Sequence, residues 1–298
     1  MINQHIKTHR YTSTFFVLLS ILAATSISLL AQTRSFNFRP LDLPNSASTE
    51  ADGINNHAEI IGFFVDLAGK QHGFLDQQGV FTQLDFPGAA ATKTVGINDR
   101  GDFVGAFTGA AGVQHGLVHR AGAYSQLDFP GAASTQALSI NNRRDIAGSF
   151  SDSAGHTHGF VERSGVFTQV DFPGGTNTVV FGINDEGELV GSFNDGAGVQ
   201  HAFAKRGDDF NQLNPPGAAT SVAFGLNAPG AIVGSFTDGS GKGHGFLDRG
   251  GNFSQVDFPG AASTDSNGIN SRGFFVGDFF DSAGVEHGYF ATQSQGHH

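Results

Sequence analysis

The sequence predicts an all-β fold, a six-bladed β-propeller with four antiparallel strands in every blade. Three observations indicate this architecture. One motif recurs six times at a constant interval of 43 residues. Every copy contains four short strand-like segments that are separated by turn residues. The chain also contains 43 glycines and 30 phenylalanines in 298 residues, a composition that favours short strands and tight turns over helices.

The recurring motif reads Leu-Asp-Phe-Pro-Gly-Ala-Ala in its most regular form, and its copies begin at Leu41, Leu84, Leu127, Val170, Leu213 and Val256. The repeats run without insertion or deletion and cover 41–83, 84–126, 127–169, 170–212, 213–255 and 256–298. Propeller blades have a period of about 40–45 residues. A parallel β-helix would repeat over a shorter coil, and helical repeats would show an apolar period of about 3.6 residues, which this sequence lacks.

The second repeat illustrates the four strands that we expect in each blade. Its strand-forming segments occupy 94–98, 102–107, 115–120 and 124–129. Glycine-containing turns separate the segments, and Pro130 ends the fourth. Alternating strands and short turns of this kind predict antiparallel hairpins.

The last repeat lacks its fourth strand, because it ends at His298 where that strand should begin. A matching segment lies before the first repeat, at about 36–43, in which Phe38 aligns with Phe81 of the next copy. We expect this N-terminal segment to complete the last blade as its outer strand. Such a strand closes the ring through backbone hydrogen bonds.

Residues 1–31 have the features of a secretory signal peptide. Lys7 and Arg10 precede an apolar run over 15–31, which ends in a small residue. At 17 residues the run is near the short limit for a membrane-spanning helix, so an uncleaved anchor is the competing interpretation. We expect the peptide to be removed, which leaves 32–298 as a single propeller domain without a membrane span. The mature protein would be secreted to the extracellular space or the periplasm.

Most residues that recur between the copies have a structural use. Glycines would allow close backbone approach near the ring axis, at Gly53, Gly96, Gly182, Gly225 and Gly268. Aromatic side chains recur in four registers and are expected to fill the space between blades. An asparagine opens the first hairpin turn of every copy, at Asn55, Asn98, Asn141, Asn184, Asn227 and Asn270.

Histidine also recurs in phase, at His72, His115, His158, His201, His244 and His287. The blade geometry would hold neighbouring members more than about 10 Å apart, whereas zinc needs each nitrogen at about 2 Å. We therefore expect no shared metal, and expect each histidine to bond the backbone or a turn of its own blade. Phased aspartates such as Asp66 are expected to form turns, and those before Phe-Pro, such as Asp85, to order loops.

These motifs resemble those of the HAF-repeat family of bacterial extracellular repeat proteins. The motif His-Ala-Phe occurs at 201–203, and His-Gly-Phe replaces it at three other copies. The accompanying motifs G-I-N-x-x-G and V-G-x-F occur at 96–101 and 104–107. The resemblance covers 41–298 and implies export and a repeat fold. It brings no established activity and no catalytic residues.

The copies differ most at the start of the innermost strand, where side chains would face one mouth of the central channel. We identify the polar members as candidate ligand-binding residues: Glu50, Asp52, Lys93, Gln136, Asp265 and Asn267. The apolar Val179 and Val222 would lie on the other side. The sequence contains no P-loop, nucleophile elbow, HExxH motif or dinucleotide fingerprint, and we expect no metal or cofactor.

Two functions remain open. The regular repeat and the missing catalytic constellation favour a secreted, non-enzymatic binding or scaffold module, whose partner is an unknown extracellular glycan, peptide or protein. The alternative is a channel-centred hydrolase or lyase, with acid–base roles for Glu50, Asp52, Lys93 and Asp265. A net charge of −11 argues against binding to nucleic acid, and the absence of cysteine excludes a disulfide framework or thiol nucleophile. We expect a monomer.

Overall fold

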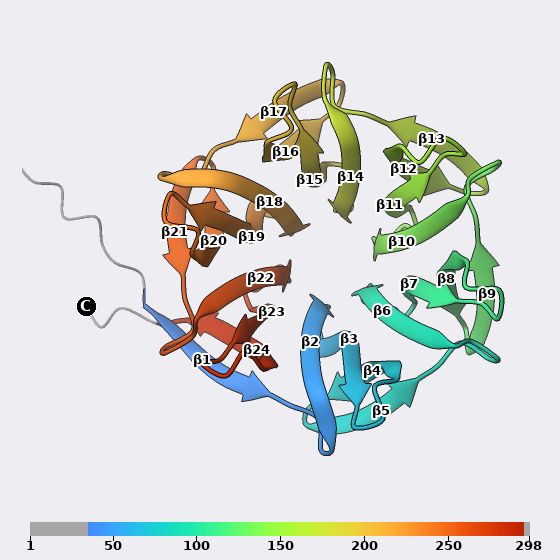
Figure 1. Ribbon diagram of the computed structural model, residues 1–298, viewed down its shortest axis with the longest axis horizontal. Helices are drawn as coiled ribbons and strands as arrows, with labels where there is room; N and C mark the ends of the chain where they lie inside the picture. Colours follow the sequence, from blue (N-terminus) through green and yellow to red (C-terminus); the bar gives the residue numbers. More distant parts are fainter. Residues whose placement is uncertain (1–34, 295–298) are drawn as a thin grey trace, which may run out of the picture. The chain divides into compact units, whose positions relative to one another are not determined.

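The computed structural model describes residues 35–294, which form six four-stranded antiparallel sheets around a central axis (Figure 1). This is the six-bladed β-propeller that the repeat predicts. The predicted signal peptide at 1–31 and its cleavage point lie outside the described residues. Within the described part of the chain, no helix is long and apolar enough to cross a bilayer.

Residues 35–294 form 24 strands, which follow one another from the axis outwards in blades 1 to 5, whereas blade 6 takes its outermost strand from the N-terminal end. Blade 1 contains β2 (Ser46–Ile54), β3 (Glu59–Asp66), β4 (Gln71–Gln77) and β5 (Val80–Leu84). Blade 2 contains β6 (Ala91–Ile97), β7 (Phe103–Thr108), β8 (Gln114–Arg120) and β9 (Ala123–Leu127). Blade 3 contains β10 (Ser134–Ile140), β11 (Ile146–Ser151), β12 (Thr157–Arg163) and β13 (Val166–Val170).

The remaining blades repeat this order. Blade 4 contains β14 (Thr176–Ile183), β15 (Leu189–Asn194), β16 (Gln200–Arg206) and β17 (Asp209–Leu213). Blade 5 contains β18 (Ala218–Leu226), β19 (Ala231–Asp238), β20 (Gly243–Arg249) and β21 (Asn252–Val256). Blade 6 contains β22 (Ser263–Ile269), β23 (Phe275–Phe280), β24 (Glu286–Gln293) and the N-terminal strand β1 (Phe36–Leu41).

The closing strand lies where the sequence predicts it. β1 pairs antiparallel with β24, from Phe36 opposite Gln293 to Leu41 opposite Gly288. The rings of Phe36 and Phe38 pack onto the blade, and the Phe38 ring lies 5.4 Å from that of Tyr289. The ring of blades is therefore closed by a strand from the other end of the chain.

Strand boundaries in the second repeat differ slightly from those predicted. β6 begins three residues earlier than expected, at Ala91, and ends at Ile97, before Asn98. Asn98 starts the turn instead, because its Oδ1 accepts hydrogen bonds from the backbone N–H groups of Arg100 (2.9 Å) and Asp102 (3.0 Å). Such side-chain acceptors hold a chain in a turn and compete with strand pairing. Gly101 has the left-handed conformation that this turn requires, with φ 75°.

The core lies between blades, as the aromatic registers predict. The second strand of each blade is buried along almost its whole length, whereas the outermost strands are mostly exposed. At four seams a phenylalanine of the Asp-Phe-Pro motif stacks on one from the second strand of the next blade, at Phe86–Phe107, Phe129–Phe150, Phe172–Phe193 and Phe258–Phe279. Their ring centroids are 3.6–3.7 Å apart. The ring planes are nearly parallel, at 3–6° to each other, and these contacts add to the apolar burial that holds the blades together.

Glycine at the axis permits the close approach that the sequence predicts. A Cβ on Gly53 would lie 2.5 Å from the carbonyl oxygen of Val95 in the next blade. A Cβ on Gly268 would lie equally close, 2.5 Å, to the carbonyl oxygen of Asp52. Both distances are below van der Waals contact, so a larger residue would push the inner strands apart.

Candidate functional site

Each inner strand carries a β-bulge close to the axis. In β2 the register of pairing with β3 shifts between Ala51 and Gly53, so that Asp52 is the extra residue. The same shift occurs at the equivalent place in the other five blades. A bulge re-aims a side chain away from the normal alternation of its strand. One extra residue from every blade thereby lines a single cavity: Asp52, Val95, Leu138, Phe181, Phe224 and Asn267.

This space, the channel cavity, has a volume of about 280 Å³ and occupies one end of the central channel. An aliphatic ring separates it from a smaller cavity of about 100 Å³ at the other end, and is formed by Ile54, Ile97, Ile140, Ile183, Leu226 and Ile269. These residues are the isoleucines of the G-I-N motif and their leucine counterpart. The repeat therefore builds the floor of the cavity, and its variable positions build the walls.

Two unlike walls enclose the channel cavity. We call its carboxyl side chains the acidic wall; they come from blades 1 and 6 and are Glu50, Asp52, Asp265, Asp278 and Glu286. We call the apolar side chains from blades 3 to 5 the aromatic wall; they are Leu138, Phe181 and Phe224. Blades 3 and 4 lie across the axis from blades 6 and 1, and blade 5 lies between blade 4 and blade 6 (Figure 1). A small molecule in the cavity would thus meet acceptors on one side and an apolar surface on the other.

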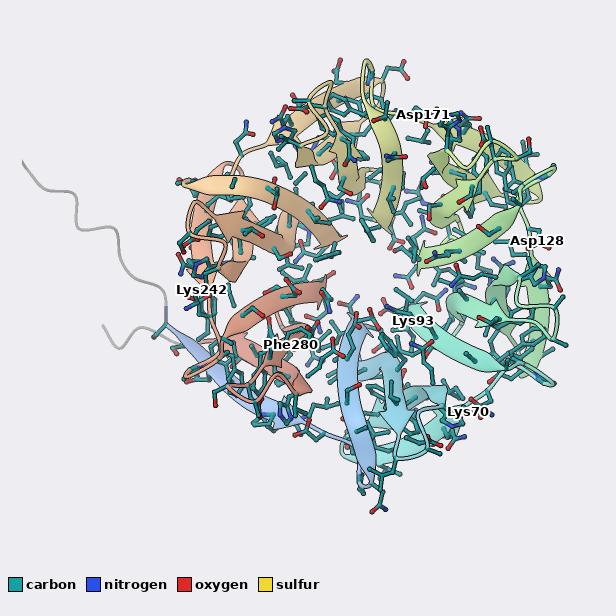
Figure 2. The ribbon with its side chains drawn as sticks, in the orientation of Figure 1. Lys70, Lys93, Asp128, Asp171, Lys242 and Phe280 are labelled. Carbon is teal, nitrogen blue, oxygen red and sulfur yellow. The ribbon has the colours of Figure 1, made fainter. Side chains whose placement is uncertain are left out.

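Lys93 brings one positive charge to the acidic wall. Its Nζ lies 3.4 Å from Glu50 Oε1, 3.9 Å from Asp52 Oδ1 and 4.1 Å from the centre of the Phe63 ring. Burial alone would lower the pKa of the Lys93 ammonium, but the carboxylates of Asp52 and Glu50 outweigh it and raise that pKa. Lys93 stays charged. Figure 2 shows it beside the channel, whereas Lys70 lies at the outer rim.

Of the two carboxyl groups beside Lys93, that of Asp52 is more deeply buried than that of Glu50. The Asp52 side chain is 8% exposed, and its Oδ2 atom is buried without a hydrogen-bond partner. Burial, reinforced by the charge of Glu50, raises the pKa of Asp52 well above its usual value, although Lys93 opposes the shift. A buried polar atom without a partner is costly. Asp52 is therefore a confined carboxyl group that contacts Glu50 and Lys93 and has one buried oxygen without a hydrogen-bond partner.

The blade 6 side of the acidic wall holds three more carboxyls. Asn267 Nδ2 donates to Asp278 Oδ1 at 2.8 Å and to the carbonyl oxygen of Ala51 at 3.2 Å, which fixes Asp278 in place. Burial, followed by the charge of Glu50, raises the pKa of Asp278 well above its usual value. Burial also raises the pKa of Asp265, and burial followed by Glu50 raises that of Glu286 to about 7.

The aromatic wall is preformed. The Phe181 and Phe224 rings contact each other edge to face, with centroids 5.1 Å apart and an interplanar angle of 78°. Both rings are half-buried, so part of each surface faces the cavity. Rigid aromatic surfaces beside a few placed polar groups are typical of small-molecule sites.

Gln136 lies in a neighbouring depression. This space, the side groove, has a volume of about 290 Å³ between blades 3 and 4, and its polar lining residues besides Gln136 are Ser134, Ser149, Ser151 and Thr157. Leu138 and Phe181 line both the side groove and the channel cavity. The two spaces therefore adjoin along the aromatic wall.

The structure brings together five of the six predicted site residues, Glu50, Asp52, Lys93, Asp265 and Asn267, and places Gln136 in the side groove. The sequence prediction missed the aromatic wall and also Asp278 and Glu286. The missed acids had a signal, because each replaces a neutral residue in every other copy. Asp278 occupies the position of Ser149, Ser192 and Ser235, and Glu286 that of Thr157.

The other end of the channel is already saturated with hydrogen bonds. Asn55 Nδ2 donates to the carbonyl oxygen of Asn98 at 3.2 Å, and Asn98 Nδ2 donates to that of Asn141 at 3.1 Å. Next to this series, the Asp99 carboxylate accepts from Asn56 and Asn142 at 2.8–2.9 Å. Because these polar groups are hydrogen-bonded to one another, the residues at this end of the channel link neighbouring blades.

The phased histidines lie at the rim, each within its own blade. His72 Nδ1 lies 2.9 Å from Asp85, which precedes Phe-Pro, and its Nε2 lies 3.4 Å from the turn residue Asp66. The ring also stacks on Phe64 with centroids 5.3 Å apart. Bonding to the blade's own turn agrees with the prediction, and Asp85 has the further role of binding the histidine. Among the described residues, no group of His, Asp and Glu is arranged to hold a metal ion.

No family model matches the sequence, and no curated protein matches it. Similar solved structures exist. The fungal Aleuria aurantia lectin, a six-bladed β-propeller with a novel fucose recognition mode, is 12% identical with a TM-score of 0.51, over 86% of this chain and 97% of the lectin. A variant of AofleA from Arthrobotrys oligospora is 11% identical with a TM-score of 0.55, over 88% and 90% of the two chains. Trypanosoma rangeli sialidase is 8% identical with a TM-score of 0.50, over 86% and 57%. At these identities the likeness is one of fold.

Proposed function

We propose that the protein is a secreted, non-enzymatic module that binds a carbohydrate in the channel cavity. The observation that carries this proposal is the pair of unlike walls around one preformed space. A sugar ring presents hydroxyl donors at its edge and C–H groups on its faces, so it matches carboxylate acceptors on one side and phenylalanine rings on the other. The volume of about 280 Å³ suits one small ring.

Two further observations support this function. The fold is shared with a lectin that recognises fucose. The features of residues 1–31 support export. Peptide or protein ligands are the other partners that a short-looped scaffold could take, and the same binding screen can include them.

A glycan array tests the proposal, with the protein expressed from residue 32. We expect selective binding of a small set of glycans, and we expect Phe224→Ala to weaken it at least tenfold, because the variant removes one ring of the aromatic wall. Val166→Ala, an exposed side chain on the outer strand β13, is the control. Binding to no glycan would overturn the function, and equal losses in both variants would remove the channel cavity as its site.

Export is tested separately by expressing the full chain in a bacterial host. N-terminal sequencing of the exported protein should give Gln32 as its first residue. Retention of residues 1–31 in the membrane fraction would support the anchor interpretation instead.

One observation favours a second candidate function, hydrolysis of a glycosidic bond. The pKa of Glu286 is raised to about 7, and a second carboxyl group, that of Asp265, lines the same cavity. A carboxyl of that pKa can serve as a general acid beside a second carboxylate. Release of nitrophenol from aryl glycosides, lost in Glu286→Gln, would establish this activity; no release with any glycoside that binds would exclude it.

A further inference from the structure

The acidic wall contains more carboxyl groups than there are cationic side chains to pair with them. Among the described residues that line the channel cavity, Lys93 is the only cationic one, and it faces five carboxyl groups. Its ammonium is engaged by Glu50 and Asp52 and covered by the Phe63 ring. Asp265, Asp278 and Glu286 on the blade 6 side therefore have no cation from the cavity lining within ion-pair distance.

Asp52 provides a second, independent sign of a missing partner. Its Oδ2 atom is buried without a hydrogen-bond partner, and the Asp52 residue lines a cavity large enough for a ligand. An N–H donor from a bound molecule would satisfy this atom. A positively charged donor would do more, because charge-assisted hydrogen bonds to a carboxylate are about twice as strong as neutral ones.

The raised pKa values of Asp52, Asp265, Asp278 and Glu286 agree with this view. These groups resist ionisation because they are buried near one another with a single lysine among them. A second cation in the cavity would stabilise their charged forms. The cavity is thus electrostatically suited to a cation.

We propose that the channel cavity binds an unacetylated amino sugar, with its ammonium group at the acidic wall beside Asp52 and its ring against Phe181 and Phe224. This inference rests on the proposed carbohydrate-binding function and specifies the class of sugar. The side groove, which shares Leu138 and Phe181 with the cavity, would take the next ring of an oligomer. Its serine, threonine and glutamine side chains suit sugar hydroxyls.

Calorimetric titration with three probes tests the inference: a β-1,4-linked glucosamine oligomer, its fully N-acetylated counterpart and a trilysine peptide. We expect the glucosamine oligomer to bind at least tenfold more tightly than the acetylated one. We also expect that preference to weaken with salt, because it depends on charge. Trilysine should bind more weakly than the amino sugar, because it lacks a ring for the aromatic wall.

Two near-isosteric variants, Asp52→Asn and Glu286→Gln, locate the ammonium site. Each should reduce affinity for the glucosamine oligomer about tenfold and change affinity for the acetylated oligomer less than twofold. Asp128→Asn, at the rim, is the control and should leave both affinities unchanged. Circular dichroism of each variant confirms folding.

The possible failures are distinct. Equal or tighter binding of the acetylated oligomer, or unchanged binding in both wall variants, would overturn the amino-sugar inference and leave carbohydrate binding standing. Preferential binding of trilysine would also overturn it, in favour of a peptide ammonium. Binding of neither oligomer, together with an empty glycan array, would remove the proposed function itself.

Discussion

Asn270 donates its side-chain amide to the backbone carbonyl of Asn55 at 3.0 Å, and this hydrogen bond joins the last blade to the first. The same link runs from Asn141 to Asn184 at 3.0 Å and from Asn227 to Asn270 at 2.9 Å. Asn184 instead donates to Glu188 Oε2 at 3.0 Å. The propeller is therefore closed twice, by β1 at the rim and by asparagine amides near the axis.

Replacing Asn270 with alanine should lower the free energy of unfolding by about 2 kcal/mol, because it leaves the buried Asn55 carbonyl without this donor and removes the turn's acceptor. Asn184→Ala is the matched control, since it also removes a turn acceptor but no side-chain bond to the next blade. Urea unfolding measures both. Equal losses in the two variants would show that the amide link between blades contributes nothing.

A chain that starts at Asn45 should lose cooperative thermal unfolding. The deletion removes β1 and exposes the edge of β24, including the fully buried Tyr289, to other molecules. A chain that starts at Ser35 keeps β1 and serves as the control. Calorimetry provides the measurement, and a melting curve unchanged by loss of β1 would contradict closure by strand pairing.

Gly191→Ala should destabilise the fold by more than about 3 kcal/mol, because its Cβ would overlap the carbonyl oxygen of Val179 and lie 2.8 Å from the Phe203 ring. Gly196→Ala is the control, since nothing lies within 4 Å of its Cβ position and its backbone is not left-handed. Denaturant midpoints report the difference. A tolerated Gly191→Ala would mean that the inner strands can move apart at little cost.

Acid should destabilise the rim. Backbone hydrogen bonds lower the pKa of Asp66, Asp281 and Asp152, the last to about 2, and bonds from His201 and Ser240 lower those of Asp195 and Asp238. A depressed folded-state pKa stabilises the fold above the unfolded value near 4, and this stabilisation is lost as pH falls through the folded value. The melting temperature should therefore drop steeply below about pH 4. A flat acidic limb would contradict these bonds.

A rise in pH from mildly acidic to neutral should destabilise the channel end of the propeller. Burial raises the pKa of Glu286 to about 7 from 4.5, and it also raises those of Asp52 and Asp278 well above their usual values. A raised folded-state pKa means that the folded chain holds more protons, so stability falls as pH rises from about 4.5 towards 7. Glu286→Gln should flatten this decline, whereas Asp128→Asn should not. The two limbs together place maximum stability in mildly acidic solution.

The blade number, the closing strand and the aromatic packing could all be predicted, because each depends on residues repeated at a fixed interval. The end of β6 before Asn98 could not be predicted, because the hydrogen bonds that the Asn98 side chain accepts in the turn compete locally with strand pairing. The candidate site was only half predictable. Asp52 and Lys93 stand out as charges at variable positions, whereas Phe181 and Phe224 resemble core residues. The β-bulges at Phe181 and Phe224 direct these two side chains into the channel, and no sequence pattern predicted those bulges.

Both ends of the described chain leave blade 6 from the same place. Phe36 lies opposite Gln293 at one end of the β1–β24 pair, and the backbone N–H of Ser294 donates to the carbonyl oxygen of Ser35 at 2.9 Å. Tension applied between these ends would load the hydrogen bonds of the pair one after another, in an unzipping direction. Attached to two separate anchors, the propeller would open at this seam under a small force and release blade 1 from blade 6. Attached by one end, it would carry no load across the seam.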